Sequence, residues 1–218
     1  MKLVAPVLAL SLASAFASSA RADSAFGRQT TSDVRGQVDG NATSPTGDGV
    51  YGRFDGDLDL GVGAGAAYLT GPGRFGFSGR LSAHYFAVAG VYVDYWDALD
   101  GGASTRRALG FGVDVRPLFI PRWSTNRQIG RPFVDLTLDS ISLGLGAFFA
   151  QPNDESFGDE RGFEASLGFG VPLLARADGP WLELRGALEW PNSSDVREKA
   201  LLLLTFHFFT LSPFARAD

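Results

Sequence analysis

The sequence predicts a closed, antiparallel, up-and-down β-barrel of about eight strands, and three observations support this prediction. From Val50 almost to the end of the chain, large apolar side chains recur at every second position, which is the period of a β-strand. Most charged residues and glycines have the opposite parity, so each strand has a bulky face and a small or polar face. The 28 glycines among 218 residues, without a collagen repeat, also indicate many strands and turns.

The first 22 residues form a predicted signal peptide. Lys2 precedes an apolar run, and Ala20-Arg21-Ala22 places small residues where signal peptidase reads them, so cleavage is expected after Ala22. The apolar run is shorter than the roughly 20 residues of a transmembrane helix, and no later run is long enough. Residues 23–49 are rich in Ser, Thr, Gly, Asp and Asn and are interpreted as a flexible segment.

Charge and cysteine content exclude several classes of protein. Cleavage removes two of the 19 basic residues and none of the 24 acidic ones, which takes the formal net charge from −5 to −7. A chain this acidic is not expected to bind nucleic acid. The chain has no cysteine, so neither disulfides nor a lipid-modified N-terminus are expected. Two histidines with scattered carboxylates lack the spacing of a metal site, and no cofactor motif is found.

The alternating segments account for eight strands within a barrel domain at 50–210, followed by a tail at 211–218. In the first segment, FDGDLDLGVGAGAAYL, the residues from Phe54 onward give one apolar row, and those from Asp55 onward give three carboxylates and then mainly glycines. A strand with one apolar and one polar face is half-buried. The predicted strands are 54–69, 74–85, 87–97, 106–119, 132–149, 162–174, 181–190 and 199–209.

The segment 132–149 changes its phase. Val134, Leu136 and Leu138 precede Asp139-Ser140, and the apolar positions then resume at Ile141. A one-residue bulge within a single strand restores the phase, whereas a tight turn would divide the segment into two short strands. The bulge is favoured because a single strand gives an even total of about eight strands and lets the loops alternate, although the exact number, eight or ten, stays open.

The strand ends place the connections in two groups. With the N-terminus in the periplasm, the acidic, Gly- and Ser-rich connections at 69–73, 97–105, 150–161 and 191–198 lie outside the cell. The connections near 84–86, at 118–131 and at 176–180 lie at the periplasmic end. The segment 118–131 is long for a periplasmic turn.

The facing of the side chains favours a membrane barrel over a soluble one. Most segments reach the roughly 9–11 residues of a transmembrane strand. Charges and glycines share the face opposite the large apolar side chains, which suits a narrow lumen inside a lipid-facing wall. Aromatic residues also mark strand ends, with Phe54, Tyr68, Phe75 and Tyr85 in positions typical of interfacial girdles. Outer-membrane lipid is therefore the expected surrounding.

The chain resembles the broad class of small bacterial outer-membrane β-barrel proteins over residues 50–210. The resemblance consists of the signal peptide, the repeated alternation and the aromatic last strand LTFHFF. It implies insertion by the barrel-assembly machinery, which reads a terminal aromatic strand. Here the sequence continues past Phe209 as TLSPFARAD, which departs from the pattern of the class.

The parities also predict a polar cluster inside the barrel. A turn near Gly71 brings His84 opposite Asp57 or Asp59 and Arg80 opposite Gly61 or Gly63, and closure places the last strand beside the first. Ion pairs that fill the lumen explain such a cluster, because an unpaired buried charge costs several kcal/mol. A catalytic or proton-handling site is the alternative. The predicted cluster comprises Asp55, Asp57, Asp59, Arg80, His84 and His207.

The favoured function is a structural or surface-binding barrel, not an enzyme and not an open pore. An eight-stranded lumen is nearly filled by its own side chains. The loop AQPNDESFGDER, with Asp154, Glu155, Asp159 and Glu160, is the first candidate for binding cations or a cationic surface, although it is equally compatible with simple solvation. The sequence identifies no ligand.

Two other functions stay open. In the first, the barrel modifies lipids as an acyl hydrolase or acyltransferase, a chemistry that some outer-membrane barrels perform with Ser, His and a carboxylate or amide. In the second, a soluble periplasmic barrel binds an apolar ligand, which requires the large apolar side chains to face inward.

Overall fold

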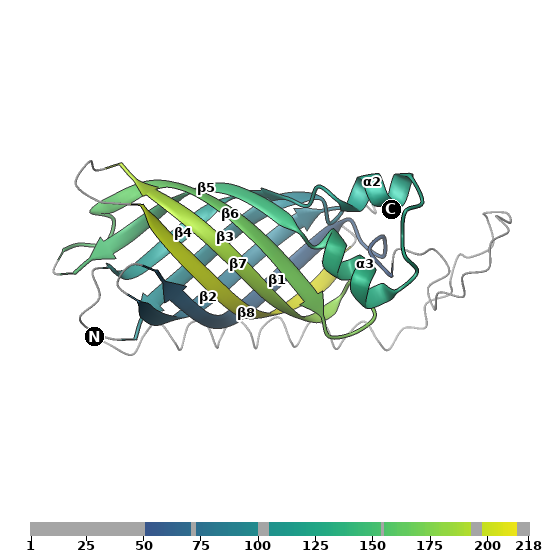
Figure 1. The fold of residues 1–218 in the computed structure, drawn as a ribbon, viewed down its shortest axis with the longest axis horizontal. Helices are drawn as coiled ribbons and strands as arrows, with labels where there is room; N and C mark the ends of the chain where they lie inside the picture. Colours follow the sequence, from purple (N-terminus) through teal and green to yellow (C-terminus); the bar gives the residue numbers. More distant parts are fainter. Residues whose placement is uncertain (1–50, 71–72, 100–104, 154, 193–197, 213–218) are drawn as a thin grey trace, which may run out of the picture. The chain divides into compact units, whose positions relative to one another are not determined.

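The computed structural model describes residues 51–70, 73–99, 105–153, 155–192 and 198–212. Within these residues, eight long strands form one barrel, and two short helices lie at one end of it (Figure 1). The predicted signal peptide at 1–22, the predicted flexible segment at 23–49 and most of the predicted tail at 211–218 lie outside the described residues. The strands are β1 (Leu58–Leu69), β2 (Arg74–Tyr85), β3 (Ala89–Ala98), β4 (Thr105–Val115), β5 (Ser142–Pro152), β6 (Glu160–Pro172), β7 (Gly179–Pro191) and β8 (Lys199–Ser212).

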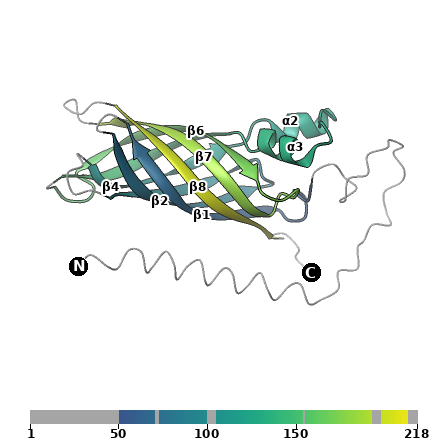
Figure 2. The same cartoon turned by 60° about the horizontal axis from the view of Figure 1, so that its bottom comes forward.

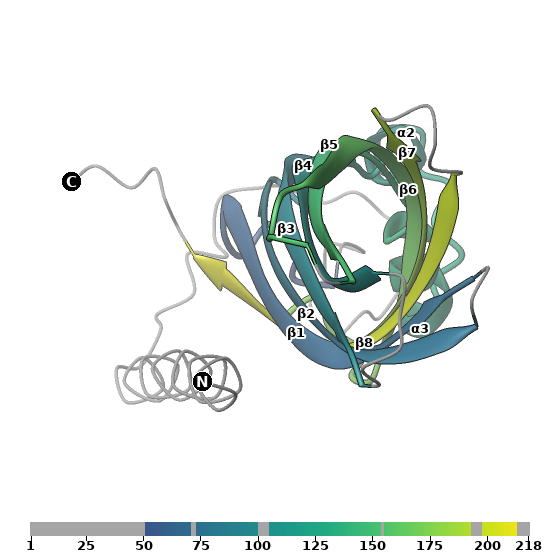
Figure 3. The same cartoon turned by 90° about the vertical axis from the view of Figure 1, so that its left-hand side faces the viewer.

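Each strand pairs antiparallel with the next, and β1 pairs with β8, so the barrel is closed. Figure 3 shows this ring of strands in a view along the barrel. The fold class and the strand number predicted from the sequence are therefore confirmed. The predicted register is also correct, because Asp59 lies opposite His84 and Gly63 lies between Arg80 on β2 and His207 on β8. We call the end with the connections 70–73, 99–104, 153–159 and 192–198 the loop end, and the other the helical end.

The side chains face as the alternation predicts. Leu81, Val93 and Phe111 are neighbours on β2, β3 and β4 and are exposed on the outer wall. Arg80 and Asp94, one position away from the first two, are buried in the interior. This facing is the opposite of what the soluble, ligand-binding alternative requires.

The helical hairpin, residues 116–141, replaces part of a predicted strand and corrects the sequence interpretation. It contains α2 (Phe119–Ser124) and α3 (Pro132–Asp139), so 132–149 is neither one bulged strand nor two short strands. A short apolar run does not distinguish a strand from a helix. Pro132 in the first turn and Asp135 close behind it favour the helix. Among the described residues, neither helix has the length and apolar character needed to cross a bilayer.

The turn between β2 and β3 is strained. Phe86 and Ala87 have φ angles of 48° and 54°, and the Val88 amide donates to the Tyr85 carbonyl at 3.0 Å. Left-handed conformations of this kind suit glycine or asparagine, because a side chain crowds the following carbonyl.

Replacing Ala87 by glycine relieves this strain. We expect Ala87→Gly to raise the free energy of unfolding by about 0.5–1 kcal/mol. Urea unfolding of the folded barrel, followed by the gel shift of the unheated protein, measures the change. Ala89→Gly, at the first position of β3, where the backbone is extended, is the matched control and should lower stability instead. Equal effects of the two substitutions would contradict the assignment of strain to the turn.

Candidate functional site

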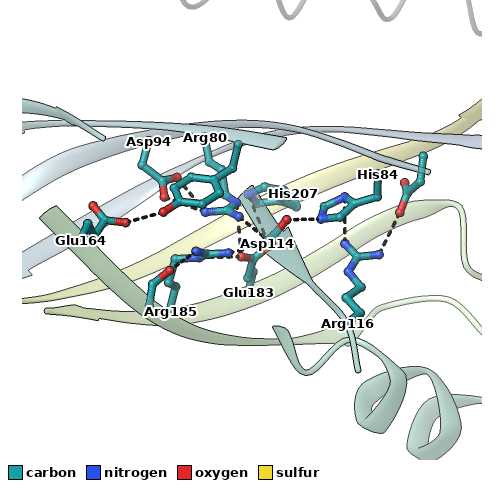
Figure 4. A network of polar contacts seen from close by, with 12 residues as sticks. Arg80, His84, Asp94, Asp114, Arg116, Glu164, Glu183, Arg185 and His207 are labelled. Atoms are coloured by element: carbon teal, nitrogen blue, oxygen red, sulfur yellow. Dashed lines mark hydrogen bonds and ion pairs between the residues drawn. The ribbon is translucent and has the colours of Figure 1, made fainter. Parts of the chain in front are cut away.

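The barrel interior holds a cluster of ion pairs centred on Asp114 of β4. Its Oδ1 accepts a hydrogen bond from His84 Nε2 at 2.8 Å, and its Oδ2 faces Arg185 Nη2 at 3.0 Å and Arg80 Nη2 at 3.4 Å. Asp114 is 2% exposed. Figure 4 shows these side chains converging from β2, β4 and β7. We call the residues labelled there the ion cluster: Arg80, His84, Asp94, Asp114, Arg116, Glu164, Glu183, Arg185 and His207.

Two arginines of the ion cluster lie against one aromatic ring. The guanidinium groups of Arg80 and Arg185 are 4.9 and 4.7 Å from the ring centroid of Tyr92. Arg80 Nη1 also donates to both oxygens of Asp94, at 2.9 and 2.7 Å, and the Tyr92 hydroxyl donates to Glu164 at 2.8 Å. Arg80 and Asp94 thus form a buried ion pair, whereas Glu164 is held by the neutral hydroxyl of Tyr92.

The tautomer of His84 follows from its neighbours. Arg116 Nη2 lies 3.5 Å from His84 Nδ1, and a guanidinium can only donate, so Nδ1 accepts and the proton is on Nε2, facing Asp114. Arg116 Nη1 donates in addition to Asp59 Oδ2 at 2.9 Å. Both nitrogens of His84 are therefore engaged in structural contacts.

The predicted cluster residues divide into two groups. Asp59, Arg80, His84 and His207 are buried in the interior. His207 packs against Phe209, with 5.3 Å between ring centroids, and its Nε2 is 3.8 Å from Glu183 Oε2.

The inward placement of Asp55 is wrong. β1 begins at Leu58, so Asp55 and Asp57 precede the strand, where Asp55 is exposed and Asp57 is half-buried. The alternation of apolar and polar residues in this segment therefore begins before the hydrogen-bonded strand β1 begins.

Several members of the ion cluster are missing from the sequence prediction. Asp94, Asp114, Glu164, Glu183 and Arg185 all have inward parity, which is the signal that could have identified them. Parity shows that a side chain enters the lumen, but not which strand faces it across the lumen.

The predicted acidic loop does not act as one group. Glu160 is buried at the start of β6, where it accepts a hydrogen bond from Lys199, and Lys199 also donates to Thr105 at 2.7 Å. Glu155 and Asp159 are exposed. Asp154 lies outside the described residues. Including Glu160 in a surface binding site is therefore wrong, because its carboxylate points into the barrel.

Packed side chains close the interior toward the loop end. A layer of buried apolar residues fills the barrel on the loop side of the ion cluster, and its largest members are Trp96, Phe148, Leu69, Leu201 and Leu203. Toward the helical end, Leu136 of α3 packs with Tyr51, Trp181 and Phe209. A cavity of about 20 Å³ lies between Arg116, His84 and Trp181, which is room for about one water molecule.

Asp135 holds the helical hairpin together. It accepts hydrogen bonds from the amides of Ile129, Gly130 and Arg131 at 2.9, 2.9 and 3.2 Å. The Tyr51 hydroxyl donates to it at 2.8 Å, and Arg122 Nη2 donates at 2.5 Å. The side chain is inaccessible to solvent.

Asp135 and Asp139 share Arg122, but their pKa values are shifted in opposite directions. Burial alone would raise the pKa of Asp135, but the Ile129 amide, the Tyr51 hydroxyl and Arg122 outweigh it and lower this pKa below its ordinary value. For Asp139, burial is the largest influence and raises the pKa, although Arg53 and Arg122 oppose it. The charged form is thus favoured at Asp135 and disfavoured at Asp139.

We expect Asp135→Asn to lower the stability of the helical hairpin by about 2 kcal/mol at pH 7. Because the folded-state pKa of Asp135 is depressed, its contribution is present above the usual aspartate pKa of about 3.9 and is lost as the pH falls through the lower folded value. Amide hydrogen exchange of residues 126–131 should therefore be faster in the variant at pH 7, with the stability difference shrinking below about pH 4.

Asp139→Asn is the matched control for this prediction. The raised pKa of Asp139 means that its ionised form costs stability at neutral pH, so the neutral amide should cause little or no loss. Equal destabilisation by the two substitutions would contradict the division of roles.

The interior offers ion pairing rather than a catalytic constellation. In the part of the chain that the structure describes, the partners of His84 are Asp114 and Arg116, and the ion-pair partner of His207 is Glu183; neither set includes a serine hydroxyl. Within the described residues, no group of three or more His, Asp or Glu is arranged to hold a metal ion. The lipid-modifying alternative would need a nucleophile beside one of these histidines.

Comparisons with known proteins give likeness of fold only. No protein family and no curated protein matches the sequence. Ail, the attachment invasion locus protein of Yersinia pestis, solved with the heparin analogue sucrose octasulfate, has a TM-score of 0.38 at 10% identity and covers 71% of this chain and 99% of its own. For Neisserial surface protein A (NspA) the values are 0.42, 15%, 71% and 96%. For the de novo designed TMB2.3 they are 0.34, 16%, 70% and 93%.

The strand pairing and the interior define the class of protein directly. This is a closed, eight-stranded, up-and-down β-barrel with an apolar outer wall and an interior filled by ion pairs. The fold thus agrees with the resemblance to small outer-membrane barrels that the sequence suggested.

Proposed function

We propose that this chain is a bacterial outer-membrane protein, a filled β-barrel with a structural or surface-binding role and no open pore. The observation that carries the proposal is the facing of the side chains: the large apolar ones cover the outside and the charged ones are enclosed. Only a hydrocarbon surrounding makes both halves of this arrangement favourable.

The outer wall forms an apolar belt. Its large members come from seven of the eight strands, and the exposed residues of β1 are the apolar Ala64 and Ala66, so no face of the wall is reserved for water. Soluble monomers rarely expose a contiguous apolar patch larger than a few hundred Å². The exposed members of the belt include Phe77, Leu81, Val91, Val93, Phe111, Val113, Leu143, Leu145, Phe163, Leu167, Phe169, Leu182, Leu188, Leu202, Leu204, Phe206 and Phe208.

The backbone of the barrel also suits a membrane. Closure by the β1–β8 pair leaves no sheet edge, so the wall's amides and carbonyls are paired within the sheet. The apolar layer around Trp96 and Phe148 and the ion cluster beneath it fill the lumen, which argues against passage of solutes.

We place the helical end in the periplasm and the loop end at the cell surface, where a binding role would fall to the exposed acidic loops. Among the described residues, the exposed acidic side chains of these loops are Glu155, Asp159 and Glu198. Insertion is assigned to the barrel-assembly machinery, with the outward-facing Phe206 and Phe208 of β8 as the aromatic signal.

Cell fractionation combined with gels of heated and unheated protein tests the proposal. We expect the chain in the outer-membrane fraction, released only by detergent, with a faster-migrating band before heating because the closed barrel resists denaturation. Purified protein in planar bilayers should give no steady ion conductance. Recovery in the soluble periplasmic fraction without detergent would overturn the membrane assignment, and a steady conductance would overturn the filled lumen.

A further inference from the structure

The helical hairpin exposes a compact set of aromatic, aliphatic and basic side chains. Ile129, Phe133 and Trp123 are 57%, 50% and 44% exposed, and Arg127 and Arg131 are exposed between them in the sequence. We call these five residues the hairpin face. Both α2 and α3 lie at one end of the barrel, as Figure 2 shows, and α3 lies next to β6.

The charge of the hairpin face is of one sign. The helical hairpin contains two acidic residues, Asp135 and Asp139, and both are buried against Arg122. Arg116 points into the barrel, toward Asp59. The exposed charges of the helical hairpin are therefore those of Arg127 and Arg131, both basic.

The hairpin face is held rigidly. Trp123 packs edge-on against Phe54, with 5.0 Å between ring centroids, and the backbone amides of Ile129 and Arg131 donate to Asp135. At the end of α3, Ser140 Oγ accepts a hydrogen bond from the Gly170 amide of β6 at 2.8 Å. A surface fixed in this way loses little conformational entropy on binding.

The hairpin face continues from the apolar belt. β4 ends at Val115 and β5 begins at Ser142, and both Val115 and Leu143 are exposed on the outer wall. The chain thus leaves the belt into the helical hairpin and returns from it directly to the belt. A surface that joins aromatic and aliphatic side chains to arginines suits the boundary between headgroups and acyl chains.

We propose that the hairpin face binds anionic phospholipid in the leaflet next to the helical end of the barrel. This inference rests on the membrane location given under Proposed function and adds a lipid preference to it. Trp123, Ile129 and Phe133 enter the headgroup region, and Arg127 and Arg131 pair with lipid phosphates. A guanidinium binds phosphate through two parallel hydrogen bonds, and each arginine near an anionic surface favours binding by roughly fivefold.

Quenching by brominated lipids tests the proposal on the full-length barrel in phosphatidylcholine vesicles. The vesicles contain equal fractions of either brominated phosphatidylglycerol or brominated phosphatidylcholine, labelled near the headgroup end of the acyl chains. The contribution of Trp123 is obtained by subtracting the fluorescence of Trp123→Phe from that of the wild type. We expect brominated phosphatidylglycerol to quench it more strongly than brominated phosphatidylcholine, with the preference weakening as salt is raised.

Charge reversal supplies the matched control. Arg127→Glu with Arg131→Glu should reduce the preference for phosphatidylglycerol by at least about fivefold. Arg106→Glu with Arg161→Glu makes the same change of charge at exposed sites of the loop end and should leave the preference intact. Equal quenching of Trp123 by both lipids, or an equal loss of preference in both double variants, would overturn the proposal.

Trp190 separates this inference from the membrane assignment. It is exposed on the outer wall near the loop end, and its fluorescence is obtained from Trp190→Phe in the same way. Quenching of Trp190 without quenching of Trp123 would leave the barrel in the membrane and assign the hairpin face to a soluble partner. Absence of quenching at both sites would refute the membrane location itself.

Discussion

Replacing Asp114 by alanine should lower the free energy of unfolding of the barrel by about 3–5 kcal/mol. The substitution leaves His84, Arg80 and Arg185 facing one another without the carboxylate that they share. His84, Arg80 and Arg185 are only 1%, 4% and 2% exposed, so these groups cannot recover the lost interactions from bulk water. Urea unfolding in lipid vesicles, followed by the gel shift of the unheated protein, measures the loss.

Two further variants sharpen this test. Asp114→Asn keeps the shape of the side chain but removes its charge, so it should lie between the wild type and Asp114→Ala. Asp55→Ala removes an exposed carboxylate outside the strands and should change stability by less than about 0.5 kcal/mol. A loss below about 1 kcal/mol for Asp114→Ala would show that Asp114 is not the centre of the ion cluster.

Val93→Arg should destabilise the barrel almost as much as Asp114→Ala does. This effect is expected only if the barrel spans a bilayer. Val93 lies in the middle of β3, between Leu81 and Phe111 on the neighbouring strands. A charge on the lipid face near the midplane costs about 2–4 kcal/mol, so Val93→Arg should lower the free energy of unfolding in vesicles by this amount.

The control for Val93→Arg lies just beyond the strand. Leu99 is 77% exposed and follows the last residue of β3, so Leu99→Arg places the same charge near the headgroups and should cost about 0–1 kcal/mol. A soluble barrel presents both positions to water and gives small effects for both. If Val93→Arg leaves the free energy of unfolding unchanged, this result would therefore contradict the membrane location.

Most of the barrel could be predicted from the sequence because a strand has a period of two and a closed barrel has two distinct environments. Register followed from the short connection near Gly71, which fixes Asp59 opposite His84. The inward direction of the Glu160 side chain could also be predicted from the sequence, because Glu160 has the same parity as the buried Glu164. Composition places Glu160 with the acidic loop, whereas the strand that follows directs its side chain inward.

The rest of the site could not be obtained from alternation. Val134, Leu136 and Leu138 fit a strand as well as one turn of a helix, and tertiary contacts decide between them. Leu136 is buried against Trp181 and Tyr51, whereas Val134 is exposed. The pairing of Asp114 with Arg185 joins β4 to β7 across the lumen. The alternation along a single strand does not predict which residues meet across the lumen.

The seam between β1 and β8 joins the first strand of the barrel to the last, with Leu58 beside Ser212 and Leu69 beside Leu201. Pairs this far apart in the chain form late, because the intervening segment must be ordered before its ends can meet. Until the seam closes, the interior is open on one side and its arginines and carboxylates stay hydrated. The final pairing therefore expels water and completes the enclosure of the charges in one event. A chain interrupted before Lys199 would gain neither the complete wall nor a dry interior.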